Sequence, residues 1–252
     1  IVDSEEEADA IVINTCCFIH DAKEESVNTI LEMAEYKKTG TCKILIVTGC
    51  MAQRYKEEIT EEIPEVDAVL GTTSYGVIVK ALNEAEAGHV FQEFKDINAL
   101  PEDSGRRVIT TGGHFGYLKI AEGCDKHCTY CIIPSLRGKF RSVPEERLLK
   151  QAEYMASQGV RELILVAQET TVYGTDLYGK KTLHILLKKL CQIKGIRWIR
   201  VLYCYPEEIY DELIQVMKEE KKICHYLDLP IQHASHRIWK RMGRRTSKAQ
   251  LV

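Results

Sequence analysis

Residues 117–131 read Tyr117-Leu118-Lys119-Ile120-Ala121-Glu122-Gly123-Cys124-Asp125-Lys126-His127-Cys128-Thr129-Tyr130-Cys131. The first five are typical of a buried strand, and the loop after them carries three cysteines spaced C-x3-C-x2-C. A loop this short can turn three thiolates toward one point, and thiolate is the ligand of iron–sulfur clusters. Three protein ligands leave one iron of a cubane free for a small molecule. We therefore predict a metal site on Cys124, Cys128 and Cys131.

Two other interpretations of this loop stay open. A zinc knuckle would need a fourth ligand such as His127, which lies inside the loop and would have to fold back beside Cys128. A chance grouping in a cysteine-rich chain is the other.

Apolar segments alternate with helical patterns beyond this loop. We expect strands over residues 117–121, 162–167, 198–203 and 226–229, and helices near residues 145–157, 182–193, 207–219 and 235–242. In sheets and barrels built this way, the chemistry lies at the carboxyl ends of the strands. Four such units are too few to close a barrel of eight. The expected fold of residues 114–252 is a partial, TIM-like (β/α) barrel.

The same alternation runs through the first 95 residues. Strands are expected over residues 10–14, 44–48 and 68–70, and helices over residues 55–62, 77–87 and a segment capped by Asp21 with the apolar stripe Val27, Ile30, Leu31 and Ala34. Strands this apolar favour a parallel α/β sheet covered on both faces. The pattern stops over residues 96–113, where turn residues at 101–105 and 110–113 predict a linker between two domains.

Composition limits the class of protein. The 252 residues carry 34 Lys and Arg against 37 Asp and Glu, a net charge of −3, and 45% are hydrophobic. This balance is typical of a globular chain of one or two domains and excludes a disordered or coiled-coil protein. No apolar run is long enough to span a bilayer and no signal segment opens the chain, so we expect a cytoplasmic protein. Because the chain begins with Ile1 and ends just after a helix, we expect a fragment truncated at both ends.

Several strings together resemble one enzyme family over essentially the whole chain. They are Tyr117-Leu118-Lys119-Ile120-Ala121-Glu122-Gly123-Cys124, Cys128-Thr129-Tyr130-Cys131-Ile132-Ile133-Pro134, Arg137-Gly138 and Arg141-Ser142. The chain resembles the methylthiotransferase branch of the radical S-adenosylmethionine enzymes. The resemblance implies that the open iron chelates the methionine moiety of S-adenosylmethionine, and that one electron splits the sulfonium to give a 5′-deoxyadenosyl radical. Such chemistry suits an unactivated C–H bond, which offers no acidic proton to a side-chain base.

The resemblance also implies a second [4Fe-4S] cluster on three separated cysteines of the N-terminal domain. Cys16 and Cys50 match two of them, and the family's first ligand would precede Ile1, so this fragment lacks one ligand. Cys17 is interpreted as a packing residue, with substitute ligation as the alternative. The remaining cysteines have no ligand-like spacing and are expected to be small buried hydrophobes: Cys42, Cys191, Cys204 and Cys224.

Contacts to S-adenosylmethionine are implied at the ends of successive strands. Gln168, Gln232 and His233 are the expected polar contacts, and Tyr130 is expected to stack on adenine or to offer its backbone. The alternatives are polar groups that cap the next helix and an ordinary core aromatic.

Members of this family differ in their target. One group modifies an adenosine in tRNA, and the other adds a methylthio group to the β-carbon of an aspartate in a small-subunit ribosomal protein. Three stretches resemble the second group: residues 14–21, 167–174 and 242–248. The slightly acidic total also lacks the strong basicity of a tRNA-binding surface.

The expected partners are therefore a small-subunit ribosomal protein and an electron donor such as flavodoxin or ferredoxin. Arginines could meet an acidic loop or flanking RNA, although solvated surface arginine is the default interpretation: Arg137, Arg141, Arg241, Arg244 and Arg245, with Lys139. Two alternatives remain, a tRNA adenosine methylthiotransferase and a non-catalytic zinc-binding adaptor of RNA or ribosomes.

Overall fold

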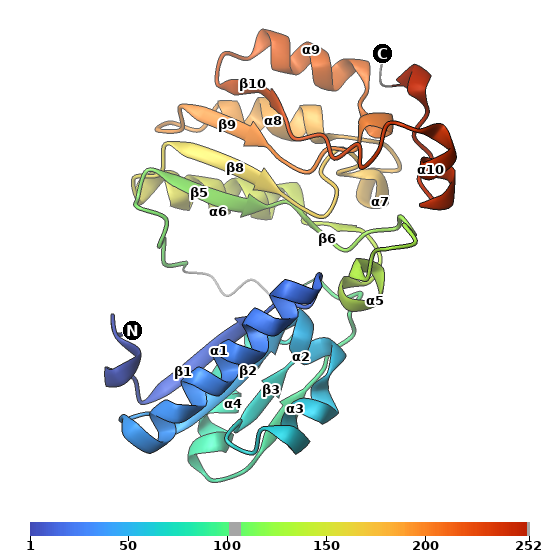
Figure 1. Cartoon of the computed structure of the whole chain (residues 1–252). Helices are drawn as coiled ribbons and strands as arrows, with labels where there is room; N and C mark the ends of the chain where they lie inside the picture. The colour runs from blue at the N-terminus through green and yellow to red at the C-terminus, as the bar shows by residue number, and fades with distance from the viewer. Residues whose placement is uncertain (101–106, 251–252) are drawn as a thin grey trace. The chain divides into compact units, whose positions relative to one another are not determined.

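The computed structural model describes residues 1–100 and 107–250, which form two compact units (Figure 1). The first unit comprises Ile1–Gly105 with Ser135–Arg137, and the second comprises Arg106–Pro134 with Gly138–Val252. The division after Gly105 falls inside the expected linker, and the turn-rich run at 101–105 lies outside the described residues.

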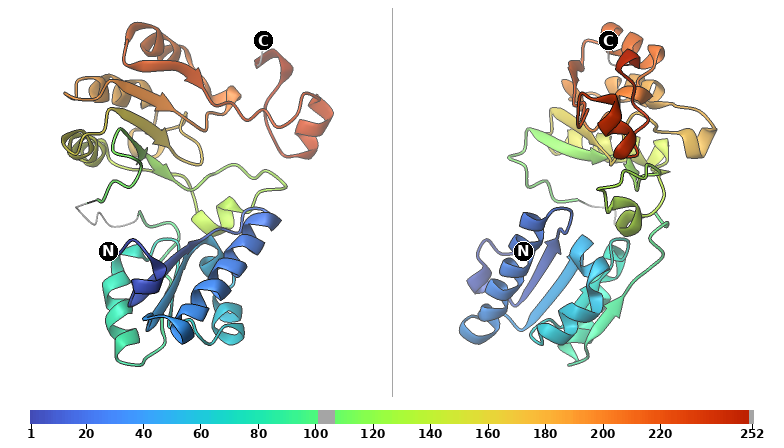
Figure 2. Two further views of the ribbon diagram at one scale, coloured as in Figure 1. Left: turned by 60° about the vertical axis from the view of Figure 1, so that its left-hand side comes forward. Right: turned by 45° about the vertical axis from the view of Figure 1, so that its right-hand side comes forward.

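The first unit is built on a parallel sheet in the order β1-β2-β3-β4. Its strands are β1 (Ala10–Thr15), β2 (Ile44–Gly49), β3 (Ala68–Leu70) and β4 (Phe91–Glu93). Every residue of β2 is buried. Ile44 and Ile46 pack with Ala81 of α4 (Ile78–Glu86). Because successive strand residues point to opposite faces, the intervening β2 residues face the other side, where α1 (His20–Thr39) lies (Figure 2). The sheet is covered on both faces, as expected.

Local details of this unit differ from the expectation. Helix α1 begins at His20 after Ile19, so Asp21 is not its N-cap but lies in the first turn, where a carboxylate favours the helix N-terminus. In the expected stripe Ile30 and Ala34 are buried, but Val27 and Leu31 are exposed. The expected helix over residues 55–62 is confirmed as α3 (Lys56–Glu62), which begins one residue later, and a separate short helix, α2 (Cys50–Arg54), precedes it. The unit also contains η1 (Glu5–Glu7) and η2 (Tyr75–Val77).

The second unit contains a parallel sheet in the order β5-β8-β9-β10. Its strands are β5 (Phe115–Lys119), β8 (Glu162–Val166), β9 (Trp198–Val201) and β10 (Ile223–Leu227). Along β8, Leu163 and Leu165 are fully buried in the main core, whereas Ile164 between them is only partly buried. One face thus packs on the helices α6 (Glu145–Ser157), α8 (Leu183–Cys191) and α9 (Asp211–Glu219), as Figures 1 and 2 show. This is the arrangement of consecutive units in a partial barrel.

The remaining elements join the ends of these strands. They are β6 (Ala121–Glu122), α5 (Ile133–Arg137), β7 (Arg141–Ser142), α7 (Thr175–Tyr178), η3 (Pro206–Glu208), α10 (His236–Arg241) and η4 (Lys248–Gln250). Three expected strand positions were wrong. The strand at 117–121 lies two residues earlier, as β5 (Phe115–Lys119), the strand at 198–203 ends at Val201, and that at 226–229 begins three residues earlier, at Ile223. No helix in the described part of the chain combines the length and apolarity needed to cross a membrane.

Candidate active site

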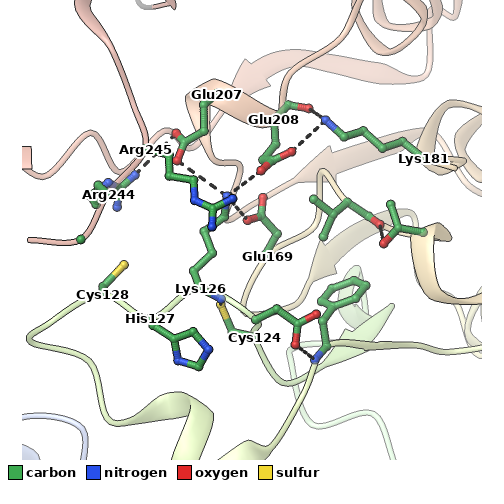
Figure 3. Close-up of a pocket in the computed structure, with 15 residues that line it drawn as sticks. Cys124, Lys126, His127, Cys128, Glu169, Lys181, Glu207, Glu208, Arg244 and Arg245 are labelled. Carbon is green, nitrogen blue, oxygen red and sulfur yellow. Dashed lines mark hydrogen bonds and ion pairs between the residues drawn. The ribbon is translucent and has the colours of Figure 1, made fainter. Parts of the chain in front are cut away.

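A cavity of about 350 Å³ lies in the second unit, on the side where the strands end (Figure 3). Loops after all four strands of its sheet supply the wall. Cys124 and Cys128 follow β5, Glu169 follows β8, Glu208 follows β9 and Arg244 comes after β10. This cavity lies at the edge of the sheet where the sequence predicts chemistry-bearing residues.

The cysteine loop contributes two of its three thiols to the wall. Cys124 and Cys128 are buried and line the cavity, whereas Cys131 is half-buried and does not. Burial raises the pKa of the Cys124 thiol to about 11. The backbone N–H of Lys126, which donates to this sulfur at 3.4 Å, has the opposite, smaller effect on the pKa. Within residues 1–100 and 107–250, no three His, Cys, Asp or Glu side chains converge closely enough to hold a metal ion. The three thiols are therefore not gathered around one point in this conformation.

Backbone and amide contacts fix where this loop starts. The Gly123 N–H donates to Oε1 of Gln168 at 2.8 Å, and the Cys124 N–H donates to the carbonyl of Gly138 at 3.1 Å. Gly123 has φ +79°, and a Cβ there would stand 2.1 Å from the carbonyl oxygen of Lys139. Gln168 thus contacts the backbone beside the cysteine loop and does not line the cavity.

A network of charges crosses the cavity (Figure 3). The Nζ of Lys126 lies 3.4 Å from Glu169 Oε2, 3.7 Å from Glu207 Oε1 and 2.7 Å from Glu208 Oε1. Lys181 adds a second ammonium 2.9 Å from Glu208. Burial opposes the charge on Glu208, but hydrogen bonds from Lys126 and Lys181 outweigh it and lower the pKa of this carboxyl. Glu208 is therefore an ion-paired carboxylate.

Glu169 differs from its acidic neighbours because it is deeply buried. Only 2% of the residue is exposed, and burial raises its pKa to about 7 although Lys126 opposes the shift. Its Oε1 accepts a hydrogen bond from Thr171, whereas its Oε2 has no hydrogen-bond partner among the described residues. Sequence reasoning missed Glu169, although its place two residues beyond the expected strand 162–167 was an available signal.

Arg244 was also misjudged, because it is not a solvated surface arginine. Its side chain is 1% exposed and lines the cavity. The guanidinium carbon stands 4.5 Å from the ring centroid of Tyr205, and one guanidinium nitrogen lies 3.9 Å from Glu207. Arg241 and Arg245 are exposed, in line with the default interpretation.

The other predicted contact residues do not reach this cavity. Gln232 and His233 are exposed, and Nδ1 of His233 accepts a hydrogen bond from the Ser235 N–H at 2.8 Å. Gln232 has a φ of +65°. Tyr130 is half-exposed and interacts with Arg244. Their roles toward S-adenosylmethionine stay predictions.

The N-terminal cysteines occupy neighbouring strand ends in the first unit. Thr15 at the end of β1 pairs with Gly49 at the end of β2, so Cys16 and Cys50 each follow the same edge of the sheet. Cys17 is buried and donates from its sulfur to the carbonyl of Cys50 at 3.3 Å, which fits a packing role. Burial, followed by the nearby Cys50, raises the pKa of the Cys17 thiol.

The other four cysteines lie away from both sets. Cys42, Cys191 and Cys204 are buried and Cys224 is half-buried, and all ten cysteines are free thiols. They are the small apolar residues that the sequence indicated, Cys224 being less buried than expected.

Comparison with known proteins identifies the family. Residues 1–71 match the uncharacterized protein family UPF0004, and residues 118–252, more than half of the chain, match the radical SAM superfamily. The chain belongs to the radical SAM superfamily. It is 66% identical over 252 residues to the ribosomal protein uS12 methylthiotransferase RimO of Lachnoclostridium phytofermentans. It is 53% identical over 254 residues to the protein of the same name from Clostridium botulinum. In both cases the match covers 100% of this chain and 57% of the relative.

Solved structures of radical SAM enzymes share the fold. The methyltransferase TsrM of Kitasatospora setae, with cobalamin and a [4Fe-4S] cluster bound, superposes with a TM-score of 0.66 at 11% identity. That match covers 96% of this chain and 52% of TsrM. The cobalamin-dependent enzyme OxsB superposes with a TM-score of 0.59 at 15% identity, over 97% of this chain and 38% of OxsB. These likenesses confirm the α/β fold that the sequence predicted.

The cavity of this radical SAM chain fits the groups that the superfamily name implies. Two thiols of a three-cysteine loop stand on its wall, and thiolates are the ligands of iron–sulfur clusters. Its volume lies within the range of about 300–1,000 Å³ usual for small-molecule sites. The Oε2 of Glu169, buried and without a hydrogen-bond partner among the described residues, suits a cationic group such as an α-ammonium. The donor set therefore suits a cluster with S-adenosylmethionine beside it.

Proposed function

We propose that the protein to which this chain belongs is a radical S-adenosylmethionine methylthiotransferase that modifies the β-carbon of an aspartate in ribosomal protein uS12. The observation that carries this proposal is the placement of Cys124 and Cys128 on one cavity wall of a radical SAM chain. The 66% identity to a uS12 methylthiotransferase over all 252 residues supports the choice of acceptor.

Cys124, Cys128 and Cys131 would hold a [4Fe-4S] cluster, which supplies the electron that cleaves S-adenosylmethionine. Gln168 and the Gly138 carbonyl position the start of this cysteine loop through the backbone hydrogen bonds of Gly123 and Cys124. Glu169, whose Oε2 lies 3.4 Å from the Lys126 ammonium, would offer its buried carboxylate to the α-ammonium of S-adenosylmethionine. Burial of these groups keeps water away from the reacting centre.

The first unit would contribute a second cluster. Cys16 and Cys50 stand at adjacent ends of β1 and β2, which brings two thiolate ligands to one edge of the sheet. The third ligand would come from sequence that precedes Ile1 in the longer protein. An external donor such as flavodoxin or ferredoxin would supply electrons, and ten free cysteines fit a reducing cytoplasm.

Replacement of one cluster ligand tests this assignment. Cys128→Ala in the full-length, anaerobically reconstituted protein is expected to abolish formation of 5′-deoxyadenosine, because the cluster loses a ligand. Cys224→Ala is the matched control, since Cys224 lies outside the cavity, and it should keep wild-type formation. Undiminished cleavage by the Cys128 variant would contradict the proposal. Zinc in place of iron and sulfide in the wild-type protein would favour a zinc-binding adaptor instead.

The acceptor is decided by a separate assay. The full-length enzyme is incubated with uS12 and, in parallel, with tRNA, and each product is examined by mass spectrometry. A methylthio mass gain on the aspartate of uS12 is expected. A gain on tRNA adenosine alone would keep the enzyme class and overturn the acceptor.

A further inference from the structure

We propose that Arg244 forms a carboxylate-binding subsite in the cavity of the second unit, an inference that rests on the proposed function. The carboxylate is either that of the methionyl group of S-adenosylmethionine or that of the acceptor aspartate.

The guanidinium of Arg244 is buried with unused donors. Its side chain is 1% exposed, and apart from a contact with the Tyr130 side chain, Nε, Nη1 and Nη2 lack a hydrogen-bond partner of regular geometry within the described part of the chain. A buried donor left unsatisfied is costly, and the cost is larger for a charged group. A ligand in the cavity that accepts from this guanidinium would remove that cost.

The nearest carboxylate does not satisfy this arginine. Glu207 Oε2 accepts a hydrogen bond from Thr246 Oγ1 at 2.6 Å, while Glu207 Oε1 lies 3.7 Å from Lys126. The distance from Arg244 Nη2 to Glu207 Oε2 is 3.9 Å, beyond hydrogen-bonding range. Tyr205 covers the guanidinium with its ring and offers no acceptor in that geometry. Glu207 therefore leaves the donors of Arg244 available.

The backbone around Arg244 is fixed on the cysteine loop. The Arg244 N–H donates to the carbonyl of Trp239 at 2.9 Å, and Trp239, itself buried, donates from Nε1 to the carbonyl of Ile231 at 2.9 Å. The Thr129 N–H donates to the carbonyl of Met242 at 3.0 Å. Gly243 packs so closely that a Cβ there would be 3.0 Å from the carbonyl oxygen of His127. The segment carrying Arg244 is thus held directly against the cysteine loop.

The chemistry of the cavity selects a carboxylate over other anions. A guanidinium presents two parallel N–H groups that match the two oxygens of a carboxylate. Glu169 also lines the cavity, and its buried Oε2 lies 3.4 Å from the Lys126 ammonium but has no hydrogen-bond partner of regular geometry among the described residues. A guanidinium and a carboxylate in one small cavity complement an α-amino acid group, which carries both charges. The surrounding acids Glu207 and Glu208 disfavour a more highly charged anion such as a phosphate.

Two ligands that differ by one carboxylate test the first source. S-adenosylmethionine and decarboxylated S-adenosylmethionine are bound to the reconstituted full-length enzyme without reductant and measured by equilibrium dialysis. Arg244→Gln is expected to weaken S-adenosylmethionine by about tenfold or more, since a hydrogen bond to a charged group is lost, and to leave the decarboxylated compound unchanged. Arg244→Lys should restore part of the loss. The control Arg237→Gln removes an exposed arginine of α10 and should change neither affinity.

The acceptor arm tests the second source. Binding of uS12 carrying the native aspartate is compared with binding of its Asp→Asn form, to wild-type enzyme and to each Arg244 variant. If the Arg244 variants no longer prefer aspartate over asparagine in uS12 but still distinguish the two sulfonium ligands, the subsite binds the acceptor. If neither discrimination changes, the inference is overturned.

The wild-type protein separates this inference from the proposed function. A wild-type enzyme that binds and cleaves S-adenosylmethionine keeps the proposed function, whatever the Arg244 variants do. A wild-type enzyme that binds neither sulfonium ligand overturns both. Arg244→Gln is tested for folding by circular dichroism. If it does not fold, the wild-type enzyme and Arg244→Lys still test the inference. A wild-type enzyme that binds S-adenosylmethionine no better than its decarboxylated form, and uS12 with aspartate no better than its Asp→Asn form, would overturn the subsite.

Discussion

At the scale of single residues, the site combines groups that would be unfavourable alone. Lys126 is half-buried, which opposes its charge, yet Glu169, Glu208 and Glu207 raise the pKa of its ammonium above the ordinary value. Glu169 receives only the longer 3.4 Å contact with this ammonium, and burial dominates its pKa. The two acids therefore differ in protonation: Glu208 is an ion-paired carboxylate near neutral pH, whereas Glu169 is close to its midpoint.

This difference predicts a pH-dependent stability that belongs to one residue. The pKa of Glu169 is raised to about 7 from an unfolded value near 4.5, so the folded protein binds more protons between these two pH values. Its contribution to stability is fully present below the unfolded pKa and is lost as pH rises through the folded pKa, by as much as roughly 3 kcal/mol. Glu169→Gln should remove this part of the pH dependence. Urea unfolding of the cluster-free protein at pH 4.5 and pH 8 measures it.

The control for that experiment is Glu153→Gln, which changes an exposed carboxylate on α6 and should leave the pH dependence as it is. A Glu169 variant whose unfolding free energy follows the wild-type pH profile would show that Glu169 titrates normally.

At the scale of elements, the turn between β6 and the cysteine loop depends on a glycine. Gly123→Ala places a Cβ 2.1 Å from the Lys139 carbonyl oxygen and also forces a side chain into a left-handed φ of +79°. Gly179→Ala imposes the same backbone strain at φ +68° but meets no atom within 4 Å. The strain alone costs about 1–2 kcal/mol, so we expect Gly179→Ala to lose about that amount and Gly123→Ala clearly more.

Denaturant unfolding compares the two variants, and iron incorporation after reconstitution reports on the cysteine loop. Gly123→Ala should incorporate less iron while Gly179→Ala incorporates the wild-type amount. Equal stability losses in the two variants would show that the loop moves away from the added methyl group at no cost.

The elements also show what sequence alone can and cannot predict. The buried strands β1, β2, β3 and β8 were located to within one residue at either end, because continuous apolar runs bounded by polar residues carry that information locally. Helix α1 was given the wrong cap because a favourable residue in the first turn, Asp21, looks the same in sequence as a cap. β10 was placed too late because its exposed C-terminal residues resemble an alternating strand.

The part of the site that lies on one loop was predicted from sequence. The part that forms where loops distant in sequence meet was missed. The three cysteines lie within eight residues, and their spacing alone predicts a metal site. Arg244 and Glu169 reach the same cavity from positions 75 residues apart, and nothing local to Arg244 separates it from the exposed Arg245. Tyr205 stands against its guanidinium and the Trp239 carbonyl accepts its backbone N–H, and these contacts follow only from the folded backbone.

At the scale of the whole molecule, each unit carries a cysteine set at the carboxyl ends of a parallel sheet. In the first unit the set follows β1 and β2, and in the second it follows β5. Placement at this edge is a general property of parallel α/β sheets, where loops leave the strands and side chains from different strands meet. Each of the two compact units therefore carries its own set of cysteines at such an edge.

If each set holds its own cluster, the loss of one should leave the other. Cys50→Ala in the full-length protein is expected to lower iron and sulfide by about four each per chain, the content of one [4Fe–4S] cluster. Formation of 5′-deoxyadenosine should persist, because Cys124, Cys128 and Cys131 are untouched, while methylthio transfer should stop. Cys42→Ala is the control, since Cys42 is a buried thiol of the same unit without ligand-like spacing. Anaerobic iron and sulfide analysis decides the matter: an unchanged iron content in the Cys50 variant would show that Cys50 holds no cluster, and loss of all iron would show that the two sites do not assemble independently.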